Sequence, residues 1–170
     1  YIIICGDCGV LWDKKSAPKM IELYESFGAT VLFIDGNHEN FDMLKVLPIV
    51  EIFGGRAHKV SDRIYHLMRG EVFEIGGKKI LAIGGAESHD KEWRLEHKTW
   101  WKDEEISEAD IRNATFNLSK CDNKADIVLT HIPPSKFKKL ILKEFTQCGE
   151  DVPIYLEPKL KNTDSEDLLK

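Results

Sequence analysis

The segment Thr30–Asn40 reads TVLFIDGNHEN and joins a strand pattern directly to a polar end. Its first half, Thr30–Ile34, is an apolar run rich in strand-forming residues and too short for a typical helix, so it predicts a buried β-strand. The polar residues Asp35–Asn40 follow at once. In open α/β sheets, ligands bind beyond the carboxyl ends of the strands. We therefore expect functional side chains at this end of the strand.

The N-terminal segment Tyr1–Val10, YIIICGDCGV, shows the same pattern. Its apolar half, Tyr1–Cys5, predicts another buried strand, and Gly6-Asp7 ends it. Between the two strands, Ser16-Ala17-Pro18 predicts a helix start, and Gly28 predicts its end. Strand, helix and strand in this order predict a βαβ unit with parallel pairing and a right-handed crossover.

The middle of the chain predicts shorter elements. We expect strands at Ile64–Leu67, Val72–Ile75, Lys79–Ile83 and Ile127–Thr130, with a tight hairpin at Gly76-Gly77. Ser107 and Asp110 resemble a capping box at the start of a helix, and Ser135 starts a further helix that ends near Phe145. The segment Gly84–Asp103 is a long loop with three tryptophans, and loops of that length are often functional or mobile.

Composition and charge limit the class of protein. A length of 170 residues predicts one domain spanning 1–170, and a net charge of -5 argues against a nucleic-acid-backbone binder. No apolar run reaches the roughly 18–20 residues of a membrane span, and no signal-peptide pattern is present. The four cysteines, at positions 5, 8, 121 and 148, are too few for a disulfide framework, so we expect a reducing cytoplasm.

Both ends of the sequence predict a truncated domain. Tyr1 begins inside an apolar strand, and Ser165–Lys170 has the pattern of a helix N-cap and first turn. We expect these ends to continue in a longer protein.

Three of the predicted buried strands end in residues suited to metal binding. Asp7 follows the first, Asn37 and His38 follow the second, and His131 follows the strand Ile127–Thr130. If these strands are neighbours, their polar ends meet at one rim of the sheet. A carboxylate, an amide oxygen and an imidazole form a mixed oxygen and nitrogen set that suits Mn, Fe or Zn.

The ordered blocks GDCG, GNHEN and THIPP resemble the calcineurin-like metallophosphoesterases. This resemblance covers residues 6–131 and is carried mainly by the G-N-H-[D/E] block. It implies an α/β fold in which a two-sheet β-sandwich is flanked by helices, in αββα layers. It also implies hydrolysis of a phosphomonoester or phosphodiester, either a small molecule or a phosphorylated substrate.

The resemblance further implies a role for each matching residue. Asp7 matches a carboxylate that bridges two divalent metal ions, and Asn37 and His131 match ligands of the second ion. His38 matches the histidine that protonates the leaving oxygen or stabilises transition-state charge, and Glu39 matches the acid that orients that imidazole. The implied cofactors are two divalent ions, with Mn favoured over Fe or Zn.

Two blocks of the family signature are absent from the sequence. No D-x-H precedes Asp7, and no G-H-x-H follows His131. The remaining residues leave the first metal with Asp7 alone, so we expect this chain by itself to hold two metals poorly. We expect the absent blocks to lie beyond the two ends.

Several alternatives stay open at this stage. The chain could be a non-catalytic binding module with an incomplete metal site. Cys5 and Cys8 have the C-x-x-C spacing of a redox pair, although we interpret them as a core residue and a loop residue. In the long loop, His89 and Arg94 either line a substrate entrance or belong to a solvated loop. Arg69 could contact phosphate, although we expect it at the surface.

Overall fold

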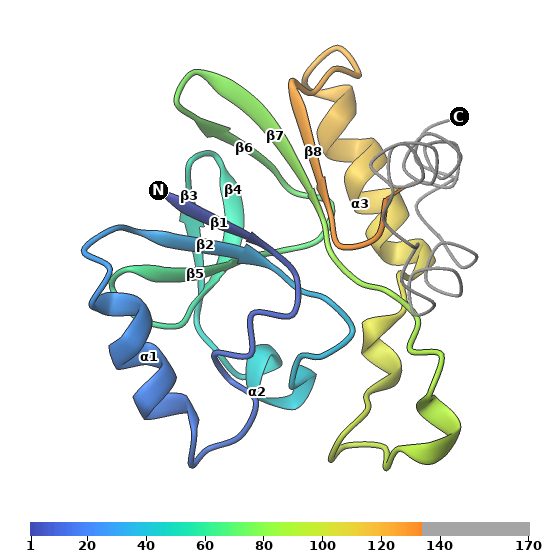
Figure 1. Ribbon diagram of the computed structural model, residues 1–170. Coiled ribbons are helices and arrows are strands. Elements are labelled where there is room, and N and C mark those ends of the chain that lie inside the picture. The colour runs from blue at the N-terminus through green and yellow to red at the C-terminus, as the bar shows by residue number, and fades with distance from the viewer. Residues whose placement is uncertain (134–170) are drawn as a thin grey trace, which may run out of the picture.

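The computed structural model describes residues 1–133 (Figure 1). It has a mixed α/β architecture with two sheets, of five and three strands, and a few helices. No helix in residues 1–133 is both long enough and apolar enough to cross a bilayer. The predicted helix Ser135–Phe145, the helix start at Ser165–Lys170 and Cys148 lie outside the described residues.

The elements follow the sequence patterns closely where those patterns are clear. In chain order they are β1 (Ile2–Cys5), α1 (Ala17–Glu25), β2 (Val31–Ile34), α2 (Phe41–Lys45), β3 (Ile49–Ile52), β4 (Gly55–Lys59), β5 (Ile64–Leu67), β6 (Val72–Ile75), β7 (Lys78–Ile83), the 3-10 turns η1 (Lys91–Trp93) and η2 (Lys102–Glu104), α3 (Glu108–Ser119) and β8 (Ile127–Thr130). The predicted strands are confirmed within one to three residues, and so are the helices predicted after Ser16 and Ser107, which are α1 and α3. The capping box of Ser107 and Asp110 at α3 is also confirmed.

The larger sheet has the strand order β1-β2-β5-β4-β3. β1, β2 and β5 are parallel, which confirms the parallel pairing expected of the βαβ unit, whereas β4 and β3 are antiparallel. β1 stands at one end of this order, so Ile2–Ile4 are only half-buried and Cys5 is exposed. The prediction that Tyr1–Cys5 is a fully buried strand is therefore wrong.

The smaller sheet has the order β6-β7-β8. The hairpin at Gly76-Gly77 is confirmed, and the positive φ angles of both glycines, 60° and 72°, are those of a type I′ turn. β8 pairs in parallel with β7 and so belongs to a different sheet from β1 and β2. The interpretation of Ile127–Thr130 as a buried neighbour of those strands is wrong, because Ile127 and Val128 are 43% and 44% exposed.

Alternating side chains on β2 and β7 connect the layers. On β2, Val31 and Phe33 pack in a cluster with residues of α1 and α2, while Leu32 and Ile34 pack in a second cluster with Phe73 of β6. That second cluster also includes buried side chains of β4, β5 and β7. On the opposite side of β7, two residues pack with Ala114 of α3. Apolar residues on both faces of β2 explain its continuous hydrophobic run.

One segment has structure that the sequence patterns do not assign. Residues 40–63 form α2, β3 and β4. The five-residue helix α2 depends on its N-cap, Asn40, whose side chain accepts a hydrogen bond from the Met43 amide. An element this short has too few residues to display a helical period.

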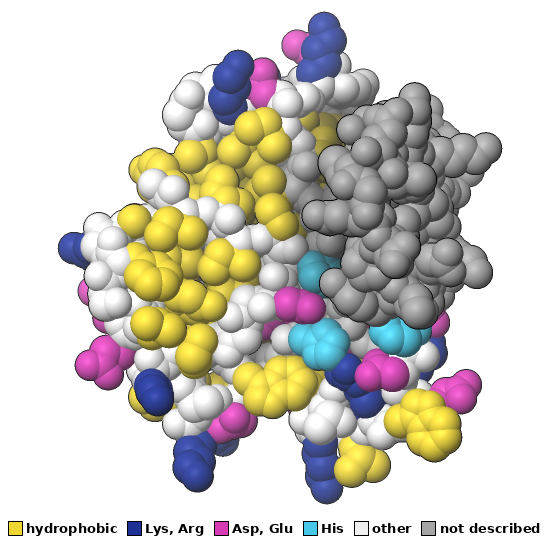
Figure 2. Space-filling view, viewed as in Figure 1, with side chains coloured by type: hydrophobic (Ala, Val, Ile, Leu, Met, Phe, Trp, Pro, Cys, Tyr) yellow, Lys and Arg dark blue, Asp and Glu magenta, His cyan; other side chains and the backbone are white. Residues whose placement is uncertain are grey.

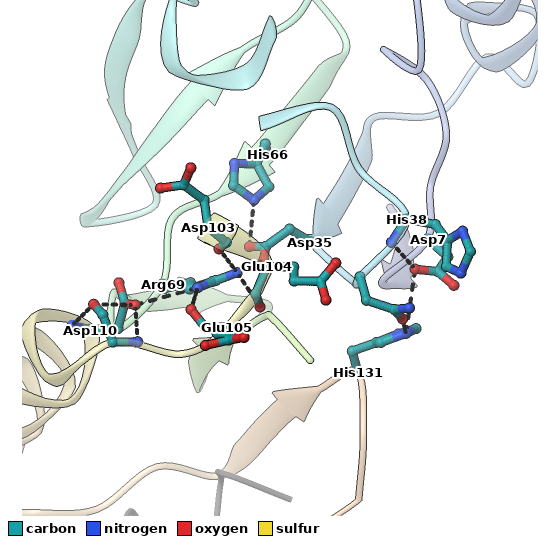
Figure 3. A network of polar contacts seen from close by, with 12 residues as sticks. Asp7, Asp35, His38, His66, Arg69, Asp103, Glu104, Glu105, Asp110 and His131 are labelled. Atoms are coloured by element: carbon teal, nitrogen blue, oxygen red, sulfur yellow. Dashed lines mark hydrogen bonds and ion pairs between the residues drawn. The ribbon is translucent and has the colours of Figure 1, made fainter. Parts of the chain in front are cut away.

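Arg69 connects the C-terminal end of the long loop to the larger sheet (Figure 3). Its Nε donates to the Asp35 carboxylate at 2.9 Å, and its terminal nitrogens donate to the main-chain carbonyls of Asp103, Glu104 and Glu105. An ion pair of 3.4 Å links it to Asp110 in the first turn of α3. The side chain is only 9% exposed, so the expectation of a surface arginine is wrong.

Asp35 is also linked by hydrogen-bond contacts to His66 and, through it, to His58. His66 Nε2 lies 2.9 Å from Asp35, and His66 Nδ1 lies 2.9 Å from His58 Nδ1. Burial by itself would raise the pKa of Asp35, but the charge of Arg69 and the hydrogen bond from His66 outweigh it and hold that pKa well below its usual range. Burial and the neighbouring His66 lower the pKa of His58 to about 4.

Replacing Arg69 with methionine should cost about 3–5 kcal/mol in the free energy of unfolding, because the change leaves a buried carboxylate without its cation. Urea unfolding followed by circular dichroism measures this loss. Arg63→Met, at an exposed position, is the matched control and should change the stability by less than about 0.5 kcal/mol. A loss below about 1 kcal/mol in the Arg69 variant would contradict the role assigned to this ion pair.

Stability should fall as the pH drops from about 6.5 to about 4. His58 stays neutral in the fold until its pKa of about 4, whereas in the unfolded chain it binds a proton near pH 6.5. The unfolded state therefore binds more protons in this window, so the free energy of unfolding rises with pH. Denaturant midpoints measured from pH 4 to 7 should show a shallower slope in His58→Gln. Identical slopes in both proteins would contradict the prediction.

Candidate functional site

Two glycines allow the polar strand ends to approach one another. Gly6 and Asp7 follow β1 with φ angles of 94° and 52°, a left-handed turn that glycine adopts without strain. A Cβ at Gly6 would lie 2.1 Å from the Nδ1 atom of His131, and a Cβ at Gly36 would lie 2.2 Å from the Oδ1 atom of Asp7. Glycine at both positions leaves the space that the site residues occupy.

The structure brings Asp7, Asn37 and His131 together, as expected from the sequence. Figure 3 shows Asp7 and His131 of this group. The Nε2 atom of His131 lies 3.2 Å from Asn37 Oδ1 and 3.4 Å from Asp7 Oδ1. The main-chain amide of His38 also donates to Asp7 Oδ1 at 3.0 Å. These residues do not share one sheet, because His131 follows β8 in the smaller sheet. The predicted rim is thus a junction between the two sheets.

Exposed histidine and acidic side chains gather on one face of the molecule. Figure 2 shows histidine and acidic side chains close together near the middle of the drawn face, beside a region of apolar side chains. The side chains of Asp7 and His131 are 33% and 14% exposed, so both remain accessible to solvent.

Main-chain and side-chain contacts fix the orientation of the His131 ring. The carbonyl of Cys5 can only accept a hydrogen bond, and it lies 2.9 Å from His131 Nδ1, so this nitrogen carries a proton. In the neutral ring, Nε2 then presents a lone pair. That lone pair faces the oxygens of Asp7 and Asn37.

A buried acid fixes the orientation of the Asn37 amide. Glu104 is fully buried and accepts hydrogen bonds from both the amide and the hydroxyl of Ser88. The Ser88 hydroxyl proton points at Glu104, so its oxygen accepts from the Asn37 Nδ2 group at 3.0 Å. This leaves Asn37 Oδ1 directed at His131, and a metal ligand held in this way by outer partners is a common arrangement.

Three hydrogen-bond acceptors therefore converge with no proton between them while His131 is neutral. A hydrogen-bond donor or a bound cation placed between these atoms would satisfy the set. Ligand atoms about 2.1 Å from a shared divalent ion are about 3.0–3.4 Å apart, which matches the separations observed here. The residues fit a divalent cation. Among residues 1–133, however, no group of three or more His, Cys, Asp and Glu side chains is arranged to hold a metal.

His38 lies between Arg94 and Trp12. The Nη1 and Nη2 atoms of Arg94 lie 3.4 Å and 3.2 Å from the two ring nitrogens of His38. The Trp12 ring lies 6.5 Å from the His38 ring, centre to centre. Arg94 thus reaches the site from the long loop, which supports the expectation that this loop borders it.

Glu39 is buried behind the site. Its Oε1 atom accepts a hydrogen bond from the Cys8 amide at 2.6 Å, and Oε2 has no hydrogen-bond partner within the described structure. Burial raises the pKa of Glu39 to about 8 against the effect of that hydrogen bond, and the charges of Asp35 and Asp7 act in the same direction as burial. Its expected role in orienting His38 stays a prediction.

The sequence patterns missed Ser88 and Glu104. The sequence analysis singled out His89, which is exposed. The residue that contacts Asn37 is its neighbour Ser88, which is buried. Neither residue belongs to a motif. The only signal was the position of the long loop after a strand, next to a polar strand end.

The two closely spaced cysteines lack the features of a redox pair. Cys5 and Cys8 are both free thiols, and Cys8 is buried. Burial and the charge of Glu39 raise the pKa of the Cys8 thiol to about 12, whereas a reactive thiol requires a lowered pKa. Cys8 packs in the cluster that contains Val31 and Phe33, which agrees with a core role.

Comparison with known proteins adds no family assignment. No protein-family model matches the sequence, and no curated protein or solved structure matches it.

Proposed function

We propose that this chain belongs to a metal-dependent phosphoesterase that hydrolyses a phosphomonoester or phosphodiester. The observation that carries the proposal is the convergence of Asp7 Oδ1, Asn37 Oδ1 and His131 Nε2 as three acceptors. The resemblance of the GDCG, GNHEN and THIPP blocks to calcineurin-like metallophosphoesterases supports the same assignment. The cofactors in this proposal are two divalent ions, with Mn favoured over Fe or Zn.

The proposed fold is the two-sheet sandwich with outer helices. Its support is the cluster that joins Leu32 and Ile34 of one sheet to Phe73 and Ile80 of the other. Packing of α1 and α2 near β2, and of α3 near β7, agrees with helices on the outer faces. In this arrangement the site lies where the two sheets meet.

The proposed chemistry assigns a role to each residue present. When bound, divalent ions activate a water molecule and stabilise the charge on the phosphoryl oxygens. Asp7, Asn37 and His131 would hold them, and Ser88 and Glu104 keep the Asn37 oxygen in place. Hydrolysis joins the water oxygen to phosphorus and breaks the bond to the leaving oxygen. The His38 imidazole donates a proton to that oxygen, so that it departs as a neutral alcohol.

One observation favours a second function, a non-catalytic binding module. The described residues 1–133 contain no group of three or more His, Cys, Asp and Glu side chains arranged for a metal. A site of this size holds one ion weakly and serves to bind a partner rather than to hydrolyse an ester. Hydrolysis and metal stoichiometry distinguish the two functions.

The full-length protein should hydrolyse an aryl phosphate or a bis-aryl phosphodiester when Mn²⁺ is added. Asp7→Asn and His38→Gln should each lower kcat by about 10²–10⁴-fold, since the first removes a charged ligand and the second a proton donor. Release of the coloured phenol, followed by its absorbance, measures the rate at each metal concentration.

Exposed positions supply the controls for that experiment. Asp62→Asn and His97→Gln make the same chemical changes at exposed positions that contact none of the proposed site residues, and should leave kcat unchanged. If neither ester is cleaved in the presence of Mn²⁺, Fe²⁺ or Zn²⁺, the hydrolase function is excluded. Stoichiometric Mn²⁺ binding without hydrolysis would instead support the binding module.

Ser88→Ala should weaken Mn²⁺ binding about 10–100-fold, because the Asn37 amide loses the partner that fixes its orientation. Isothermal titration calorimetry of the full-length protein measures this affinity without relying on catalysis. Ser119→Ala, which removes an exposed hydroxyl from α3, is the control and should bind Mn²⁺ as the wild type does. Unchanged affinity in Ser88→Ala would remove Asn37 from the proposed ligand set.

A further inference from the structure

Arg94 is a cation held at the edge of the candidate site by the loop that carries it. Its Nε and Nη2 atoms both lie 2.9 Å from Asp90 Oδ2, and Nη1 donates to the Thr99 carbonyl at 3.1 Å. The side chain is 16% exposed, so it is largely fixed yet still reaches solvent. Its two terminal nitrogens face the His38 ring.

The donors of Arg94 outnumber the acceptors that residues 1–133 are seen to offer it. A guanidinium carries five N–H groups. Nε donates to Asp90 and Nη1 to the Thr99 carbonyl, while Nη2 forms an ion pair with the same Asp90 oxygen. Each terminal nitrogen also directs an N–H at a ring nitrogen of His38. A neutral imidazole has a single accepting nitrogen, and an imidazolium has none. At least one N–H of Arg94 is therefore directed at a group that cannot accept it.

This mismatch marks a place for an oxyanion. A guanidinium presents parallel N–H groups that suit carboxylate and phosphate oxygens, and such charge-assisted hydrogen bonds are about twice as strong as neutral ones. An oxygen placed beside Arg94 and His38 would accept from the donor that the imidazole leaves unsatisfied. Asp90 and the Thr99 carbonyl hold the guanidinium in advance, so little conformational freedom is lost when the anion binds.

We propose that Arg94 binds the terminal phosphoryl group of a phosphomonoester and so makes monoesters the preferred substrate class. This inference rests on the proposed function, since it names the substrate of the same site. A monoester carries three unesterified oxygens and close to two negative charges at neutral pH, whereas a diester carries two such oxygens and one charge. The additional oxygen and charge are the features that Arg94 recognises.

The position of Arg94 explains why this selection depends on the loop. Arg69 fixes the end of the loop through the carbonyls of Asp103 and Glu104, and Glu104 in turn holds Ser88. Arg94 lies between these anchors in the sequence. Arg94 therefore lies on the same loop as the residue that orients Asn37.

The test compares one monoester with one diester of the same phenol. In the full-length protein with Mn²⁺, Arg94→Gln should lower kcat/KM for the aryl phosphate about 10–100-fold, the loss expected for a charge-assisted hydrogen bond. The value for the bis-aryl diester should fall less than about threefold, because the diester lacks the additional oxygen and charge that Arg94 recognises. Arg94→Lys keeps the charge but not the fork, so its monoester value should lie between those of wild type and Arg94→Gln.

The matched control is Arg112→Gln. Arg112 pairs with Glu108 four residues away, as Arg94 pairs with Asp90, but it is exposed on α3. It should change neither kcat/KM value. Thermal midpoints of all variants show whether the loop remains folded, and Arg94→Lys keeps the test valid if Arg94→Gln unfolds.

A second measurement separates this inference from the proposed function. Binding of inorganic phosphate, followed by calorimetry, should weaken about tenfold or more in Arg94→Gln and stay unchanged in Arg112→Gln. If the wild type cleaves neither ester, the proposed function fails, while the phosphate titration still decides the role of Arg94. If the wild type cleaves esters but Arg94→Gln reduces both equally or neither, the assignment of Arg94 to monoester recognition is overturned.

Discussion

The buried ion pair between Arg69 and Asp35 is the interaction on which the rest of this structure depends. Asp35 directly follows β2 and stands two residues before Asn37, while Arg69 follows the neighbouring strand β5. The guanidinium also binds three consecutive carbonyls at the end of the long loop. Neither charge is stable in the interior without the other, because an unpaired buried ion costs several kcal/mol. The pair thus ties the position of the loop to the end of β2.

Contacts around the site then determine which atoms face one another. The Cys5 carbonyl selects the His131 tautomer, and Glu104 selects the direction of the Ser88 hydroxyl. Each contact removes a choice that the side chain would have in water. The outcome is a set of acceptors held close together, which is unfavourable without a positive charge between them. The fold thereby maintains an arrangement that the isolated side chains would avoid.

The sequence predicted every described strand except β3 and β4, because the apolar runs of the others are bounded by glycine or polar residues, as Gly6 ends β1 and Gly76 separates β6 from β7. It also predicted that Asp7, Asn37 and His131 meet. The sheet to which β8 belongs was not predictable, because strand pairing depends on contacts between distant segments that leave no local pattern. The burial of Arg69 was missed for the same reason, since its partners lie more than thirty positions away.

The origin of the site residues in two different sheets has a thermodynamic consequence. Asp7 and Asn37 follow strands of the five-stranded sheet, and His131 follows a strand of the three-stranded sheet. An ion shared among them would act as a cross-link that exists only in the native state. By mass action, a hundredfold excess of ion over its dissociation constant would add about 2.7 kcal/mol to the cohesion of the sheets. Binding of an ion at this junction and the stability of the packing between the two sheets would therefore be coupled.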